Sequence, residues 1–537
     1  MPKFKIDDLA LAASMPNDPL VLRYFKAFTR SGRIDTEKGL FNGQPMSEEQ
    51  KEISQLLCTT DIGEKILTLE KADYEPILQN VIKRLRSHGI VVGSKYKKIL
   101  RDMSIVMAQS SLLNKPAIIT ARPGLGKTEM LISTLIEKSK RTIPYTAMVV
   151  TQRVGDAVKI RDEVNKELGA EVCFVRPTFT LMTLDGKHCL KGYTAKQYNV
   201  SRCSSAKCNI TTCPVKHRHS SFRNYKIVLI TTEHFNTLVD RGTLEKFQEL
   251  PPLKLPGMID GYYLPRDDLY IDENPGMVFH PLITNKFLND CMAHLKQNQF
   301  DQNFIHEFAS VIRTISVQMA GEKDYAYIDA PNMDSQLTED FIKAWRAKPL
   351  EDHYTAPERI NAFMECGGIR QNGNKMIEYA IGINRYRKLT PCESRTVILD
   401  GTGIKDLTYK SDDFNILDLP EIRSFSRATL HRYPRNLSKN FLANNRTKQK
   451  IHEIAMETIR VVGESQALFI TYNKYSDTFI KLFEEHTNIR VNHFGNLIGR
   501  NEYLDCNAVV FAGVHDWGAM QYFNQMTAVK GGRVDLS

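Results

Sequence analysis

Several features are missing from the 537-residue sequence, and each absence excludes a class of protein. No stretch approaches the roughly 18 consecutive apolar residues of a membrane span, and acidic residues interrupt the only apolar stretch near the start, so no secretory signal is predicted. Fixed-period repeats and low-complexity linkers are also absent. We therefore expect a cytoplasmic protein without a membrane partner, folded as about three or four domains or as two domains with insertions.

Acidic residues are absent from one long stretch, residues 186–226, which carries nine Lys and Arg residues of a chain whose net charge is +10. Tyr193, Tyr198, Phe222 and Tyr225 are interleaved with these cations. Cations without acids predict a surface that contacts phosphates, and the aromatic rings could stack on unpaired bases. The alternative is a solvated face balanced by acids from elsewhere in the fold.

The same stretch holds four of the ten cysteines: Cys189, Cys203, Cys208 and Cys213. Ten cysteines in a long chain without a secretory signal argue against a disulfide framework. Thiolates at this density suit zinc or an iron–sulfur cluster, whereas ordinary buried cysteines are the alternative. Structural zinc sites favour closer pairs than Cys203 and Cys208, although His217 and His219 could substitute as ligands. A distant first ligand suits [4Fe–4S] equally well.

A phosphate-binding loop follows a short apolar strand that begins near Pro116. It consists of Ala121, Arg122, Pro123, Gly124, Leu125, Gly126, Lys127 and Thr128, and an amphipathic segment follows it. Glycines let backbone N–H groups surround phosphates, Lys127 can reach the β and γ phosphates, and Thr128 can bind Mg²⁺. The alternative, a chance string in a turn, lacks the flanking strand and helix that the motif requires.

An acidic pair follows a second apolar strand, Leu269–Ile271. We expect Asp272 to hold Mg²⁺ and Glu273 to orient or deprotonate the attacking water. A lone acidic pair is usually a solvated strand end, so its position downstream of the phosphate-binding loop carries this interpretation. Together with Lys127, these two carboxylates are the predicted catalytic residues.

Strands and helices alternate along much of the chain, which predicts a parallel sheet covered by helices. Strand candidates end at Thr151 and Thr232, and further candidates lie in RTVILDGTG, QALFITY and NAVVFAG. Residues 1–95 read as a helical accessory region. About a hundred residues after DLYIDENP have helical periodicity and read as an insertion, after which a second α/β unit follows.

With a phosphate-binding loop, a four-cysteine insert and an acidic pair in that order, the chain resembles the iron–sulfur-containing superfamily-two helicases, the group that includes XPD and DinG. Further matching positions are Thr151, Gln152 and Arg153 for motif Ia, Asp400–Gly403 for motif III, Phe469–Tyr472 for motif IV, and His493–Asn496, Gly499–Asn501 and Asp505 for motif V. The resemblance covers roughly residues 96–515.

The resemblance implies an α/β fold of two RecA-like P-loop domains with a cysteine-rich metal-binding insert and a helical arch-like insert. The first domain would span 96–279, including the insert 186–226, and would resume at 391–408. The arch-like insert would span 280–390, and 409–537 would form a second domain, incomplete at its C-terminus. Such enzymes move along single-stranded DNA, usually 5′ to 3′.

Two departures from the helicase pattern stand out. Asp272-Glu273-Asn274 replaces the acidic box of many relatives, which changes the residue that couples hydrolysis to movement. The family's motif VI is not visible before Ser537, and Arg533 does not restore its pattern. Since an arginine at the γ-phosphate contributes on the order of 10³–10⁵ in rate, its absence predicts poor turnover unless Arg533 or a partner supplies the charge.

The leading hypothesis is an ATP-dependent translocase or helicase with ATP, Mg²⁺ and a [4Fe–4S] cluster, or Zn²⁺, as cofactors. Its partners would be single-stranded or forked DNA and other subunits of a replication, repair, defence or mobile-element complex. The predicted DNA contacts are Thr151, Gln152, Arg153, Lys207, Lys216, Arg218, Asn496 and Arg500. The alternatives are an ATP-switched nucleic-acid-binding regulator or scaffold with weak hydrolysis, and a P-loop ATPase that moves protein or DNA within a larger assembly.

Overall fold

The structure of the chain is a computed structural model. The described residues are 34–35, 38–41, 44–48, 51, 74–108, 116–122, 124–141, 145–176, 222, 225–240, 244, 266–274, 282–320, 325–331, 336–350, 353, 355–371, 376–378, 395–403, 409, 414–420, 429, 437, 442, 448–494, 503 and 505–513. The chain divides into two units, Met1–Ile422 with Met520–Ser537 and Arg423–Ala519.

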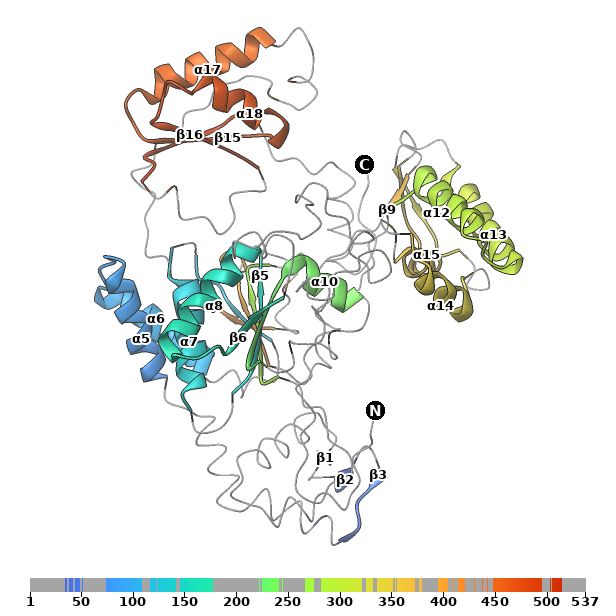
Figure 1. Cartoon of the computed structure of the whole chain (residues 1–537), viewed down its shortest axis with the longest axis horizontal. Coiled ribbons are helices and arrows are strands. Elements are labelled where there is room, and N and C mark those ends of the chain that lie inside the picture. The colour runs from blue at the N-terminus through green and yellow to red at the C-terminus, as the bar shows by residue number, and fades with distance from the viewer. Residues whose placement is uncertain are drawn as a thin grey trace, which may run out of the picture. The chain divides into compact units, whose positions relative to one another are not determined.

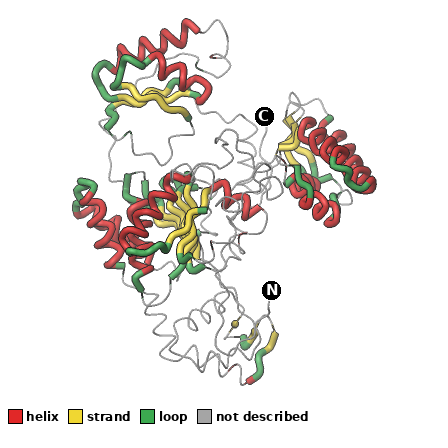
Figure 2. The backbone as a smooth tube through the Cα atoms, in the orientation of Figure 1, coloured by secondary structure: helices red, strands yellow, loops and turns green. Residues whose placement is uncertain are grey.

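The first unit contains a seven-stranded sheet with the strand order β14-β4-β13-β8-β5-β7-β6 (Figures 1 and 2). All six pairings between neighbouring strands are parallel, which confirms the predicted parallel sheet. The strands are β4 (Ala117–Ile119), β5 (Ala147–Thr151), β6 (Cys173–Val175), β7 (Ile227–Thr231), β8 (Asp268–Asp272), β13 (Arg395–Leu399) and β14 (Asn415–Leu417).

Successive side chains along a strand point to opposite faces of the sheet, and in these strands both sets are apolar. Helices therefore cover both faces. Val149 and Tyr270 belong to a core shared with four helices, whereas their neighbours Val150 and Ile271 face a second core that includes Phe235. The four helices are α5 (Glu75–Ser87), α6 (Ser94–Ala108), α7 (Lys127–Ser139) and α8 (Val154–Leu168), and α10 (Thr232–Asp240) lies on the second face. This mixed α/β arrangement with a large parallel sheet fits a RecA-like fold.

The last strand of this sheet, β14, lies beyond residue 408, where the sequence placed the start of a second domain. Leu417 pairs with Ile119 of β4, and Thr120 donates from its backbone N–H and its hydroxyl to the Leu417 carbonyl at 3.2 and 2.9 Å. β14 was missed because its three residues have little periodicity and no recognisable motif follows them, as one follows β4.

A buried polar cluster lies between α7 and the beginning of β8. Lys138 donates to the Asp268 carboxylate at 2.9 Å and to the Tyr270 hydroxyl at 3.1 Å, and the Tyr145 hydroxyl donates to the same carboxylate at 2.8 Å. The Lys138 and Asp268 side chains are only 4% and 0% exposed. Burial and the Asp268 charge raise the pKa of Tyr145, so its hydroxyl stays a donor. This cluster holds a charged pair inside an apolar layer.

Residues 282–378 contain both helices and strands, whereas the sequence predicted a helical insert. The described elements are β9 (Leu282–Thr284), α12 (Asn285–Gln297), α13 (Gln302–Met319), β10 (Tyr325–Ile328), α14 (Glu339–Ala347), α15 (Ala356–Cys366), β11 (Gly368–Gln371) and β12 (Met376–Glu378). The strands form an antiparallel sheet of order β10-β11-β12-β9. Their three or four residues are too short to alter the helical periodicity of the whole segment.

The helices and the sheet of this segment enclose their own core. Trp345 is fully buried, and the Phe308 and Phe341 rings stack with centroids 5.8 Å apart. Thr284 ends β9 and caps α12, because its hydroxyl accepts from the Phe287 N–H at 3.0 Å. Gly367 separates α15 from β11 at φ +68°, where a Cβ would lie 2.2 Å from the Ile328 carbonyl oxygen. This segment, which has a core of its own, is inserted in the chain between β8 and β13 of the parallel sheet.

The region expected to be helical before residue 95 contains three short strands as well as α5. They are β1 (Ile34–Asp35), β2 (Leu40–Phe41) and β3 (Gln44–Pro45), joined in an antiparallel sheet. Two-residue strands have no periodicity that a sequence pattern could reveal.

The second unit contains α17 (Lys448–Val462), β15 (Ala467–Thr471), α18 (Asn473–Leu482), β16 (Ile489–His493) and β17 (Ala508–Phe511). Its three strands are parallel in the order β16-β15-β17, and Phe469 of β15 packs against Phe479 of α18 at 4.5 Å between centroids. The strands predicted in QALFITY and NAVVFAG are thereby confirmed. Across the described parts of both units, no helix has the length and apolar character needed to span a bilayer.

Candidate nucleotide-binding site

The candidate site lies at the carboxyl edge of the parallel sheet. Leu399 at the end of β13 pairs with Ile119 of β4 on one side and with Asp272 of β8 on the other. Because these strands are parallel and in register, the segments that follow them leave the sheet at the same edge. Those segments are the phosphate-binding loop, the acidic pair and the residues after Leu399.

The predicted phosphate-binding loop forms a glycine turn directly before α7. Gly124 and Gly126 have φ values of +82° and +75°, a region that side chains with a Cβ adopt only with strain. Gly126 occupies the N-cap position of α7 and accepts the Met130 N–H at 2.8 Å through its carbonyl oxygen. Since glycine has no side chain to cap the first turn, the N–H groups of that turn and the helix dipole suit an anion.

Lys127 and Glu273 meet in the folded chain although 146 positions separate them. The Lys127 ammonium donates to Glu273 Oε1, and both side chains are largely removed from solvent. Glu273 has a positive φ of +68°, and its backbone N–H donates to the Leu399 carbonyl at 3.1 Å. A non-glycine residue in this conformation stores backbone strain, which concentrates at functional sites. The structure thus brings together a predicted phosphate ligand and the predicted water-orienting carboxylate.

Asp272 lies beside this ion pair and has an unusual proton affinity. Burial raises the pKa of its carboxyl from 3.8 to about 7; Lys127 lowers the pKa, and Glu273 and Asp156 raise it. A hard divalent cation would favour the ionised carboxylate, because its charge offsets the cost of burial. The carboxylate of Asp272 and the hydroxyl of Thr128 are oxygen donors of the type that Mg²⁺ prefers, so these residues fit the predicted ion.

The residues that follow β5 reach the acidic segment. Gln152 donates from its side-chain amide to the Asn274 carbonyl at 3.1 Å, while the buried Thr151 hydroxyl donates to the Arg153 carbonyl at 2.9 Å. Arg153 is the N-cap residue of α8. These three residues, predicted to contact DNA, lie at the same edge as the acidic pair. The Thr151 hydroxyl shapes the turn before α8.

The segment after β13, which the sequence aligned with motif III, is a tight turn built around Asp400. One carboxylate oxygen of Asp400 accepts the Thr402 N–H and hydroxyl, each at 2.8 Å, and the other accepts the Tyr409 hydroxyl at 3.0 Å. A Cβ on Gly403 would lie 2.9 Å from Ile118 Cγ2. Asp400 is therefore occupied with holding the turn against β4.

Several predicted site residues lie outside the described residues. These are Pro123, the cysteines Cys189, Cys203, Cys208 and Cys213, the substitutes His217 and His219, the basic residues Lys207, Lys216, Arg218 and Arg533, and the motif V positions Asn496 and Arg500. Within the ranges that the structure does describe, no group of three or more His, Cys, Asp or Glu side chains is arranged to hold a metal ion. The metal-binding insert and its basic surface stay predictions.

Sequence reasoning missed the contacts that support the phosphate-binding loop. Leu85 of α5 and Tyr96 of α6 flank Gly126, at 3.2 and 3.4 Å from the position that a Cβ would take. Arg84 of α5 donates to Glu129 in the first turn of α7 at 2.8 Å. The apolar periodicity of α5 predicted a buried face, but nothing in the sequence identified α7 as the helix against which this face packs.

No family model and no curated protein matches the chain. A solved structure, that of S. tokodaii Xpd4, is similar with a TM-score of 0.40 and 12% sequence identity, and the match covers 80% of this chain and 87% of that chain. A likeness of this extent assigns no family and no activity to the chain.

Proposed function

We propose that this chain is an ATP-dependent translocase or helicase that acts on single-stranded DNA. The pairing of Lys127 with Glu273 beside Asp272 carries the proposal, because it joins a phosphate-binding loop to two carboxylates at one edge of a parallel sheet. The contacts among these side chains support hydrolysis of a nucleotide whose γ-phosphate would lie near Lys127. Mg²⁺, held by Thr128 and Asp272, would neutralise charge on the phosphates during the reaction.

The protein's own residues would act in a defined order. The first-turn N–H groups of α7 and the Lys127 ammonium would bind the phosphates, and the phosphates would displace Glu273 from Lys127. Glu273, once released, would orient and deprotonate the attacking water. Gln152 links the β5 edge to Asn274, so a change at the acidic segment would reach the residues predicted to contact DNA. Movement along DNA would follow from that coupling.

A single-strand-stimulated ATPase assay tests the proposal. We expect stimulation of the wild type, complete loss in Lys127→Ala, and preserved activity in Lys166→Ala, which removes the same charge from an exposed position on α8. Glu273→Gln should bind ATP and DNA but hydrolyse ATP on the order of 10²–10³ times more slowly, because it lacks the general base. ATP binding without DNA-stimulated turnover in the wild type would contradict the motor.

A second candidate function rests on the same ion pair. Glu273 is engaged by Lys127, and a site that kept this pair after nucleotide binding would hold ATP without activating water. The chain would then be an ATP-switched nucleic-acid-binding regulator or scaffold. In that case Glu273→Gln would bind DNA with the same ATP dependence as the wild type, and neither protein would turn ATP over.

Measuring DNA affinity at several salt concentrations tests whether the predicted basic insert contacts DNA, independently of the ATPase site. Contacts with several phosphates predict that log K falls steeply with log salt concentration. Replacing Lys207, Lys216 and Arg218 by Gln together should reduce the slope by about two, at about 0.7 per single-strand phosphate contact. An unchanged slope would place the DNA on another surface.

A further inference from the structure

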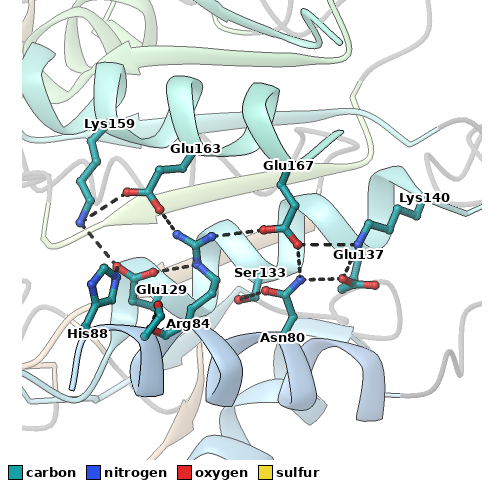
Figure 3. Close-up of polar contacts among 11 residues, drawn as sticks. Asn80, Arg84, His88, Glu129, Ser133, Glu137, Lys140, Lys159, Glu163 and Glu167 are labelled. Atoms are coloured by element: carbon teal, nitrogen blue, oxygen red, sulfur yellow. Dashed lines mark hydrogen bonds and ion pairs between the residues drawn. The ribbon is translucent and has the colours of Figure 1, made fainter. Parts of the chain in front are cut away.

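Arg84 is the centre of a polar interface between α5 and the two helices beside it (Figure 3). Its Nε donates to Glu129 Oε2 at 2.8 Å, its Nη2 contacts Glu163, and its Nη1 is 3.4 Å from Glu167 Oε2. Glu129 belongs to α7, and Glu163 and Glu167 belong to α8. The Arg84 side chain is only 12% exposed, so its charge is held by these three carboxylates and not by water.

The Arg84–Glu129 contact reaches the phosphate-binding loop. Glu129 lies two residues after Lys127 in the first turn of α7, and its side chain is 10% exposed. The next residue of α5, Leu85, lies against Gly126 of the loop. Two consecutive residues of α5 therefore contact the N-cap glycine and the first turn of α7, whose N–H groups would bind the phosphates.

The electrostatics of the first turn depend on this contact. The dipole favours a carboxylate near a helix N-terminus. Arg84 holds the Glu129 carboxylate on the α5 side, and Lys159 and His88 approach it at 3.5 and 3.6 Å. Replacing Arg84 would remove the nearest cation from Glu129 and the contact that ties the first turn of α7 to α5.

We propose that Arg84 is a positioning residue of the nucleotide site: through Glu129 it holds the first turn of α7 in the geometry that binds phosphate. The proposal deepens the proposed function and rests on it. It makes α5, which precedes the phosphate-binding loop in the chain, a necessary part of that site, although Arg84 itself touches no nucleotide.

The experiment measures the Kd for Mg–ATP and the melting temperature of the full chain in parallel. Arg84→Gln and Glu129→Gln should each weaken Mg–ATP binding by about tenfold, a factor that corresponds to about 1.4 kcal/mol. The double variant should bind no more weakly than either single variant, because both remove one contact. Glu129→Gln keeps the other two Arg84 contacts, so it serves as the readout if Arg84→Gln fails to fold.

Two control variants separate a positioning role of Arg84 at the nucleotide site from a general contribution to the packing of α5. Arg86→Gln removes the same charge from an exposed position on α5 and should change neither quantity. Asn80 donates to Glu137 at 2.7 Å and to Glu167 at 3.0 Å, away from the loop. Asn80→Ala should therefore lower the melting temperature and leave the Kd of the folded protein unchanged.

Each outcome has one interpretation. An unchanged Kd in Glu129→Gln and Arg84→Gln, with a lowered melting temperature, would overturn the positioning role and leave Arg84 a stabilising residue. An equal rise of the Kd in Asn80→Ala would overturn it as well, because any loosening of α5 would then suffice. If the wild type binds no Mg–ATP, or if the wild type and Lys127→Ala have the same Kd for Mg–ATP, the proposed function is contradicted and not only the role of Arg84.

Discussion

Replacing Asp272 by Asn should stabilise the protein in the absence of nucleotide, even though it removes a residue of the candidate site. The pKa of this carboxyl is raised from 3.8 to about 7 by burial, so the folded state disfavours its ionised form. Each unit of pKa difference between the folded and unfolded states corresponds to 1.36 kcal/mol. At pH 8 the ionised carboxylate therefore costs roughly 4 kcal/mol of folding stability. Asparagine carries no charge, so this value is the upper limit of the stability that Asp272→Asn can gain.

The pH dependence gives the sign of the effect. A carboxyl group with a raised folded pKa destabilises the folded state above that pKa, and the penalty disappears as the pH falls toward the unfolded pKa of 3.8. The advantage of Asp272→Asn should therefore shrink from roughly 4 kcal/mol at pH 8 to about 2 kcal/mol at pH 5. Other titrating groups contribute equally to both proteins and cancel in the difference.

Urea unfolding of the wild type and Asp272→Asn at pH 5 and pH 8, without and with Mg–ATP, measures this difference. Mg–ATP should stabilise the wild type more than the variant, because the variant lacks a carboxylate that would bind the ion. Asp162→Asn, on the exposed side of α8, is the matched control and should show no comparable pH-dependent gain. A variant that is less stable than the wild type by the same amount at both pH values would refute the reasoning.

Three further predictions concern other parts of the chain. Lys138→Ala should destabilise the fold by about 3–5 kcal/mol in urea unfolding, because Asp268 would keep a buried charge without its cation; an effect below 1 kcal/mol would contradict this account. Gly126→Ala should abolish Mg–ATP binding, since its φ of +75° disfavours a Cβ that would also approach α5; binding at the wild-type level would show that the loop relaxes. Anaerobically purified protein should absorb visible light and lose its iron in Cys203→Ser and Cys208→Ser if the cluster is [4Fe–4S], whereas a colourless protein with stoichiometric zinc would identify the other metal.

Much of the fold follows from local patterns. The apolar strand before Ala121, the glycines and Lys127 after it, and the strand ending at Asp272 all appear in the sequence as contiguous segments, and the structure confirms these strands and the helix that starts at Lys127. The short strands β9 to β12 and β14 were not predicted, because three or four residues carry little periodicity and, unlike β4, these strands are not followed by a recognisable motif.

The sequence by itself predicted which residues bind phosphate and which carboxylates act on it. It did so because a glycine turn between a strand and a helix is specified by neighbouring residues. Only the tertiary structure decided that Lys127 contacts Glu273, that burial raises the pKa of Asp272, and that Arg84 contacts Glu129 in the first turn of α7. Each of these depends on the parallel register of distant strands or on the surface that a helix covers, and such contacts are selected by packing between segments far apart in the chain.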